Sequence, residues 1–252
     1  MFKTKNLFLY FLVFFLAYSC KKKNYSLTKI KGELITLDST SLSKKQIKSI
    51  IKPYKESMIK EINTVISFAP KSLVRTDGKL QSSLGNLIAD LCFEKADSIF
   101  FAKTGKHVDF AMSNYGGIRA GIDKGNVTNR NVFELMPFEN TLVVVEMTGE
   151  KILELGTYFF KGKTAHPLSK QVQMKINSKG FDIRVLNKKI SKDKTYFVAT
   201  SNYLLSGGDR MYFFKNPVSV FESNYLIRDA IKSHFKSKDT LVSSLDNRVI
   251  LN

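Results

Sequence analysis

The stretch that decides the fold covers residues 110–140 and reads FAMSNYGGIRAGIDKGNVTNRNVFELMPFEN. Val108, Phe110 and Met112 alternate with Asp109 and Ala111, which predicts a half-buried strand that runs into Asn114. Gly116 and Gly117 follow, and two residues without Cβ atoms permit a sharp turn or the close approach of a ligand. Arg119 is therefore expected in a tight loop at a strand end, a common position for ligand-holding residues.

A similar arrangement occurs once more, closer to the C-terminus. Residues 195–201 form a strand candidate that leads into Tyr203. A second glycine pair, Gly207 and Gly208, then precedes Asp209. Because both loops follow strands, a single cleft can gather the polar and aromatic side chains that they carry.

Three ordered motifs in these loops resemble a known protein family. NYGGIR at 114–119, MPFEN at 136–140 and NYLLSGGD at 202–209 resemble the C-terminal, substrate-binding domain of 5′-nucleotidases and UDP-sugar hydrolases. The similarity extends from a helix candidate at 83–90 to residues 245–248, so it covers most of the chain. The resemblance implies an α+β fold in which mixed β-sheets are flanked by helices in layers.

The resemblance also implies a nucleotide site. Phe138 and Tyr203 have flat faces on which a base can stack, and Asp209 can accept hydrogen bonds from a ribose diol. Arg119 offers a planar fork for phosphate, and the two asparagines suit either base edges or loop bracing. The substrate-binding positions implied by the family are Asn114, Gly116, Gly117, Arg119, Phe138, Asn140, Tyr203, Gly207, Gly208 and Asp209.

The chain departs from the family pattern ahead of the helix candidate at 83–90. Family members typically carry there an arginine that meets the substrate, whereas this chain has Gly78 and Leu80 in that region. Arg75 and Lys79 are the two candidates to replace it, and the sequence does not choose between them.

Metal-assisted phosphate hydrolysis requires a cluster of Asp, His and Asn ligands that hold two metals. The histidines of the chain are His107, His166 and His234, which occur in unrelated settings and are interpreted as surface or turn residues. The sequence contains no Asp-x-His, Gly-Asp-x-x-Asp or Asn-His-Asp motif. We therefore expect no catalytic residue and no cofactor in this chain, and we expect divalent metals only in a partner metallophosphatase.

Residues 1–19 have the features of a secretory signal. Lys3 and Lys5 precede an apolar stretch at 7–16, and Ala-Tyr-Ser-Cys at 17–20 resembles a bacterial lipobox. This pattern predicts that Cys20 is lipidated and that the protein is anchored to a bacterial membrane in the cell envelope, on its periplasmic or surface face. The alternative is an ordinary signal with a coincidental cysteine.

After the signal, residues 20–43 are polar and predict a tether, and residues 44–252 predict one domain. A long amphipathic helix is expected at 44–67, kinked or divided by Pro53, with an apolar stripe that we interpret as core packing and not as a membrane face. Hydrophobic residues make up 43% of the chain, enough for one core. Cys92, the one cysteine after Cys20, is expected to be a buried and inert thiol.

The formal net charge of +18 attracts anions in general. The lysines are scattered in pairs among serines and not among aromatic residues, which argues against specific nucleic acid binding. We interpret the chain as a nucleotide- or nucleotide-sugar-binding module that is inactive alone and works with a separately encoded metallophosphatase. The alternative is a non-catalytic surface lipoprotein that binds nucleosides or polyanions.

Overall fold

A computed structural model describes residues 25–38, 40–41 and 43–252 of the chain. The chain divides after Ile50 into two compact units. The predicted signal at 1–19 and the predicted lipidation site at Cys20 lie outside the described residues. Among the helices that are described, none combines the length and the apolar character that crossing a membrane requires.

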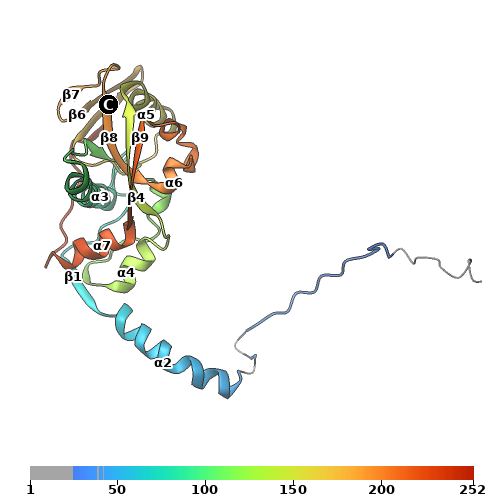
Figure 1. The fold of residues 1–252 in the computed structure, drawn as a ribbon. Helices are drawn as coiled ribbons and strands as arrows, with labels where there is room; N and C mark the ends of the chain where they lie inside the picture. The colour runs from blue at the N-terminus through green and yellow to red at the C-terminus, as the bar shows by residue number, and fades with distance from the viewer. Residues whose placement is uncertain (1–24, 39, 42) are drawn as a thin grey trace, which may run out of the picture. The chain divides into compact units, whose positions relative to one another are not determined.

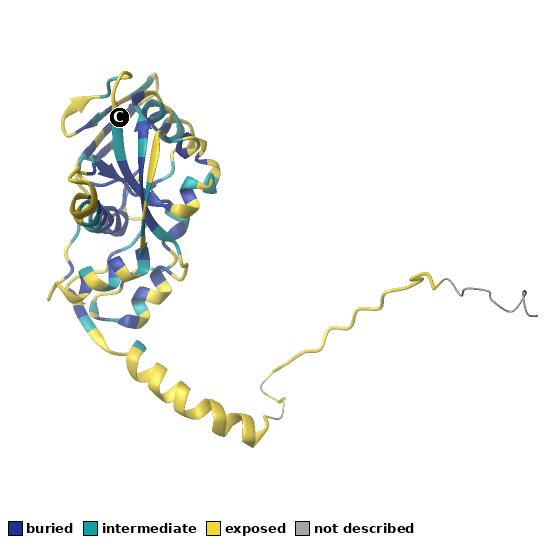
Figure 2. Ribbon diagram, in the orientation of Figure 1, coloured by how far each residue is buried: buried dark blue, intermediate teal, exposed yellow. Residues whose placement is uncertain are grey.

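Helix α2 (Lys45–Ile62) is one continuous helix that contains Pro53. The predicted division of the helix at the proline is therefore wrong, whereas a kink there stays a prediction. The core-packing interpretation of the apolar stripe is also wrong, because α2 has no buried residue and is exposed along nearly its whole length (Figure 2). Residues 65–67, which we expected in the helix, belong to strand β1 (Val65–Ala69).

The sheet at the centre of the larger unit has four strands, with β4 and β8 in the middle (Figure 1). Neighbouring β2 and β8 are parallel, whereas β4 is antiparallel to both of its neighbours, so the sheet is mixed. The order across the sheet is β2 (Phe110–Ala111), β8 (Thr195–Ser201), β4 (Thr141–Thr148) and β9 (Ser219–Leu226).

Both faces of this sheet are covered, which explains why β4 reads as a nearly continuous apolar run. Helix α3 (Ser83–Thr104) covers one face, where Phe100 packs in a cluster with Val144. Successive side chains of a strand point to opposite faces, so Val145 contributes to the other core, which includes residues of α5 (Gly149–Gly162).

A second mixed sheet packs on that other core. Its order is β10 (Val249–Leu251), β5 (Val172–Asn177), β6 (Gly180–Val185) and β7 (Lys188–Lys189). Strands β5 and β6 form the hairpin that their alternating pattern favours. Gly156 of α5 permits the close approach of this sheet, because a Cβ atom there would lie 2.1 Å from the ring of Phe181.

The remaining elements surround the third core, on which α3 also packs. They are β3 (Gly125–Thr128), which pairs with β1, and the helices α4 (Asn129–Leu135) and α7 (Ile227–Lys236). The elements together form layers of mixed sheet and helix, so the predicted α+β fold is confirmed. Cys92 lies buried on α3, where burial raises the pKa of its thiol to about 12 and keeps it protonated.

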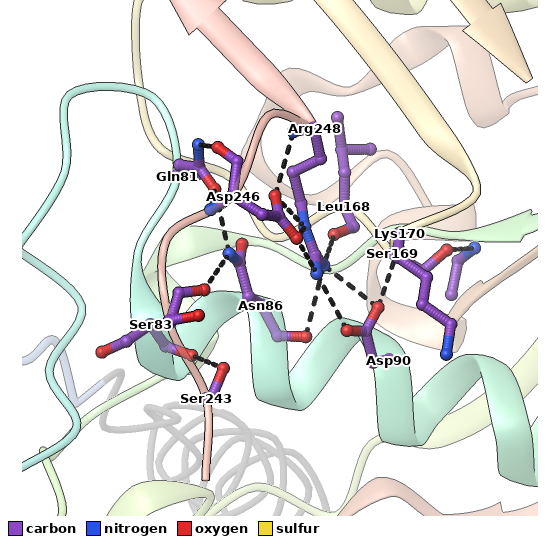
Figure 3. Close-up of polar contacts among 12 residues, drawn as sticks. Gln81, Ser83, Asn86, Asp90, Leu168, Ser169, Lys170, Ser243, Asp246 and Arg248 are labelled. Atoms are coloured by element: carbon purple, nitrogen blue, oxygen red, sulfur yellow. Dashed lines mark hydrogen bonds and ion pairs between the residues drawn. The ribbon is translucent and has the colours of Figure 1, made fainter. Parts of the chain in front are cut away.

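An ion-pair network around the buried side chain of Arg248 ties the C-terminal segment to α3 (Figure 3). The guanidinium of Arg248 donates to both carboxylate oxygens of Asp90, at 2.9 and 3.0 Å, and to Asp246 at 2.7 Å. It also donates to the carbonyl oxygen of Leu168 at 2.8 Å. Asp90 in turn accepts from the backbone of Lys170 at 2.8 Å, so the network fixes the loop that follows α5.

Candidate functional site

The sheet topology brings the three sequence motifs to one edge. Strands β2 and β8 are parallel neighbours in the register Ala111 to Ala199, so their carboxyl ends lie at the same edge. Strand β4 runs the other way, with Leu142 opposite Ser201, so the loop that precedes β4 arrives at that edge as well. The loops 114–119, 136–140 and 202–209 therefore converge, although up to 95 positions separate hydrogen-bonded residues within them.

The three loops line a cavity of about 240 Å³ that is open to solvent. Its lining consists of eight of the ten positions that the sequence proposes for substrate binding: Asn114, Gly116, Gly117, Arg119, Phe138, Asn140, Tyr203 and Asp209. The structure thus brings these residues together, and their part in binding a substrate stays a prediction.

Asp209 is held from three directions. Its Oδ2 atom accepts from Nδ2 of Asn114 at 2.7 Å, and its Oδ1 atom accepts from the hydroxyl of Tyr203 at 2.8 Å. Its carbonyl oxygen accepts from the hydroxyl of Tyr158 at 3.0 Å. The hydrogen bond to Asp209 raises the pKa of the Tyr203 phenol, which therefore remains a donor. A carboxylate has about four acceptor positions, so Asp209 keeps capacity for a ligand.

The remaining two proposed residues, Gly207 and Gly208, do not line the cavity. Gly207 adopts φ 93°, a left-handed conformation that favours glycine, and turns the chain after the short helix α6 (Asn202–Leu205). A Cβ atom on Gly208 would lie 2.4 Å from the ring of Tyr203. Their function in the structure is therefore to shape the loop and to leave room for that ring.

Phe138 and Tyr203 are the two aromatic residues of the cavity, and they are 40% and 41% exposed. An aromatic ring that is this exposed has apolar surface to gain from contact with a base. Arg119 is exposed too, and its guanidinium carbon lies 5.9 Å from the centre of the Phe138 ring. Its Nη1 donates to the carbonyl oxygen of Gly116 at 3.2 Å, which leaves other N–H groups of the fork available.

Arg75 supports the first loop and does not line the cavity. Its guanidinium lies 4.5 Å from the centre of the Tyr115 ring, and its Nη1 donates to the carbonyl oxygen of Ile118 at 2.6 Å. Lys79 is exposed and is not part of the lining either. Neither of the two candidates therefore takes the place of the family's upstream arginine in the cavity, and Arg119 is the cation that the described cavity contains.

His166 is a residue that the sequence interpretation placed wrongly. It is buried beside Tyr158, and its Nδ1 accepts a hydrogen bond from the backbone N–H of Tyr115 at 3.1 Å. Burial lowers the pKa of His166 to about 4, so the ring is neutral and able to accept. Nothing local in the sequence indicates this position, because the loop after α5 reaches Tyr115 only through the tertiary fold.

The other two histidines are not placed to bind a metal. Within the part of the chain that the structure describes, no group of three or more His, Cys, Asp or Glu side chains is arranged to hold a metal ion. His107 contacts Asp97 at 3.0 Å, and His234 lies 3.6 Å from Glu94. These are separate pairs of one histidine and one carboxylate.

Sequence comparisons identify relatives of this chain. It is 36% identical over 151 residues to the trifunctional nucleotide phosphoesterase protein YfkN of Bacillus subtilis, a match that covers 51% of this chain and 9% of the relative. It is 28% identical over 193 residues to the 5′-nucleotidase of Vibrio vulnificus, covering 71% of this chain and 32% of the relative. The chain therefore matches less than a third of the length of either protein.

Solved structures show the same fold. The 5′-nucleotidase precursor of Thermus thermophilus superimposes with a TM-score of 0.67 at 23% identity, over 81% of this chain and 42% of that protein. A putative 5′-nucleotidase of Staphylococcus aureus gives a TM-score of 0.62 at 15% identity, over 85% and 45% of the two chains. The family model described as 5′-nucleotidase, C-terminal domain, matches residues 61–216, which is more than half of the chain. The chain thus belongs to the 5′-nucleotidase C-terminal domain family.

Proposed function

We propose that this chain is the nucleotide- or nucleotide-sugar-binding module of a 5′-nucleotidase-type hydrolase, and that a separately encoded metallophosphatase supplies the catalytic metals. The observation that carries the proposal is the convergence of an aromatic pair, a braced carboxylate and an arginine on one cavity. These groups match the three parts of a nucleotide, since rings stack on a base, a carboxylate accepts from a ribose diol, and a guanidinium binds phosphate.

The side chains of the cavity support the assignment of nucleotide binding to this chain and of catalysis to a separate protein. Its polar side-chain groups are two amides, one phenol hydroxyl, one carboxylate and one guanidinium, a set suited to binding. A two-metal phosphatase site needs several carboxylate and imidazole ligands within a few Å of one another. We place those ligands in the partner protein, where they would act on the phosphate of a nucleotide held by this chain.

Lipid anchorage belongs to the same proposal. The lipobox-like residues at 17–20 support attachment at Cys20, in the cell envelope of a bacterium. Replacement of Cys20 by alanine, followed by detergent-phase partitioning of the protein from its native host, tests the anchor. Recovery of that variant in the detergent phase would refute lipidation at this residue.

A binding panel tests the proposed function directly. Calorimetry on the full chain with adenosine, AMP, uridine, UMP and a UDP-sugar should detect binding of at least one compound, and no phosphate should be released from it by this chain alone. If every compound fails to bind while heparin binds, the polyanion-binding alternative that the +18 charge suggests is correct instead.

A further inference from the structure

We propose that helix α2 (Lys45–Ile62) is a membrane-surface helix, which lies on an anionic lipid bilayer with its isoleucine-rich face in the headgroup region. Binding of α2 to a bilayer would be independent of nucleotide binding. The helix holds a row of large apolar side chains in solvent, which is unfavourable unless another surface covers them.

The apolar stripe of α2 has the spacing of one helix face. Ile47, Ile51, Tyr54 and Met58 follow one another at steps of four, three and four residues, and all are at least half exposed. Ile50 extends this stripe and is 63% exposed. In a folded protein, apolar side chains gathered in a row and rimmed by polar residues usually mark a surface that another body covers.

The charge of the helix favours an anionic lipid bilayer as the surface that covers the apolar stripe. Lysines recur on the face beside the stripe with the same spacing, at positions 45, 48, 52 and 55. With Lys60, the helix carries five lysines against two glutamates, Glu56 and Glu61. A lysine-rich polar face beside an apolar stripe is the pattern of helices that lie in the interface of anionic bilayers. Each lysine stem can lie along the apolar boundary while its ammonium group reaches the lipid phosphates.

The chain provides a clean probe, because it contains no tryptophan. Met58→Trp places a single indole on the apolar face, and Glu56→Trp places it on the opposite face, two positions earlier. Both variants are made in the full chain and mixed with vesicles of phosphatidylcholine, with or without phosphatidylglycerol. Because the indole reports only on α2, attachment through the N-terminal segment does not produce the signal.

The emission of Met58→Trp should move to shorter wavelength with phosphatidylglycerol vesicles and should be quenched by brominated lipids, whereas Glu56→Trp should emit as in water. Adding Lys52→Gln and Lys55→Gln to Met58→Trp should weaken the lipid-dependent shift by roughly 30-fold in partition constant. High salt should weaken it as well.

Three results would overturn the proposal. The first is an unchanged emission of Met58→Trp on anionic vesicles in a protein with native circular dichroism. The second is a shift that appears without lipid and grows with protein concentration, which would assign the stripe to a second copy of the chain. A shift that requires added metallophosphatase would likewise assign it to the catalytic partner.

Discussion

The hydroxyl of Tyr203 donates to Oδ1 of Asp209 at 2.8 Å, and the backbone N–H of Asp209 donates back to the same phenol oxygen at 3.3 Å. This closed pair joins the residue suited to stack on a base to the residue suited to hold a ribose. Asp209 adopts φ 51°, a conformation that costs energy for a non-glycine residue, so the surrounding hydrogen bonds hold it in place. Asn114 completes the arrangement from the other loop.

The Tyr203 hydroxyl should therefore contribute to affinity beyond the stacking of its ring. Tyr203→Phe should weaken nucleoside binding by roughly 2- to 12-fold, because one hydrogen bond that positions Asp209 is lost. Calorimetry with adenosine and with uridine measures the change. Tyr212→Phe, at an exposed tyrosine outside the cavity lining, is the matched control. An affinity equal to that of the original protein would show that Asp209 needs no such positioning.

Phe138→Ala should weaken the binding of every nucleoside by roughly 5- to 150-fold, since base stacking on one aromatic ring contributes about 1–3 kcal/mol. Calorimetry with the same nucleosides measures the loss. Phe101 on α3 is similarly exposed and lies outside the cavity lining, so Phe101→Ala should leave the affinity unchanged. If the two variants bind nucleosides equally well, the cavity does not hold a base against Phe138.

Arg119 should decide how strongly phosphate adds to affinity, because it is the cation of the described cavity lining. Arg119→Ala should lower the affinity for AMP by roughly 10-fold or more and change that for adenosine little, since a hydrogen bond to a charged group contributes about 1.5–3 kcal/mol. The measured quantity is the ratio of the two dissociation constants. Arg184→Ala, on β6 outside the cavity, should leave that ratio as it was.

Stability should fall as the pH drops from 6.5 towards 4, because of His166. Burial lowers its pKa from 6.5 to about 4, so the unfolded chain binds a proton in this range and the folded chain does not. The stabilisation is complete above pH 6.5 and decreases by on the order of 3 kcal/mol by pH 4. Urea unfolding at pH 7 and pH 5 measures the loss. His166→Gln should flatten this dependence, whereas a His107→Gln control should retain it.

The stability of the folded protein should decrease a second time at more acidic pH, when Asp246 becomes protonated. Burial alone would raise its pKa, but the hydrogen bonds from Arg248 outweigh that effect and lower it below 3.8. The stabilisation is therefore present above pH 3.8 and is lost as the pH falls through the lower folded value. Arg248→Ala should cost less than about 3 kcal/mol at pH 7, because Asp90 and Asp246 lose their cation but are 25% and 42% exposed and so are screened by solvent. Urea unfolding of Asp246→Asn, which has no carboxylate to protonate, should show a smaller acid loss.

The sequence predicted the fold class through its resemblance to a family, and it predicted the loops of the cavity through local patterns that depend on short-range chemistry. The glycine pair after Asn114 and the one before Asp209 indicate tight loops wherever they occur. The strand candidate at 195–201 became β8 with the same bounds. Strand β2 was predicted too long, because its alternating pattern continues after its pairing with β8 has ended.

The partners of the side chains were decided by the tertiary structure alone. Asn114 and Asp209 meet because parallel β2 and β8 end at the same edge, and no property of either loop encodes that pairing. The sequence left the role of Arg75 open, and in the structure its guanidinium donates a hydrogen bond to the carbonyl oxygen of Ile118. His166 became a buried acceptor because the loop after α5 is held against Tyr115.

The sequence of helix α2 predicted its amphipathic pattern but not the surface that its apolar stripe faces. Its amphipathic spacing was readable from the sequence, but a stripe of isoleucines looks alike whether it faces a core, a partner or a lipid surface. Only the three-dimensional structure shows that no residue of α2 is buried. The sequence by itself therefore determined which segments form helices, strands and glycine loops, through local periodicity and backbone preference. The tertiary structure decided which side chains meet, because contacts between distant residues depend on strand order and packing.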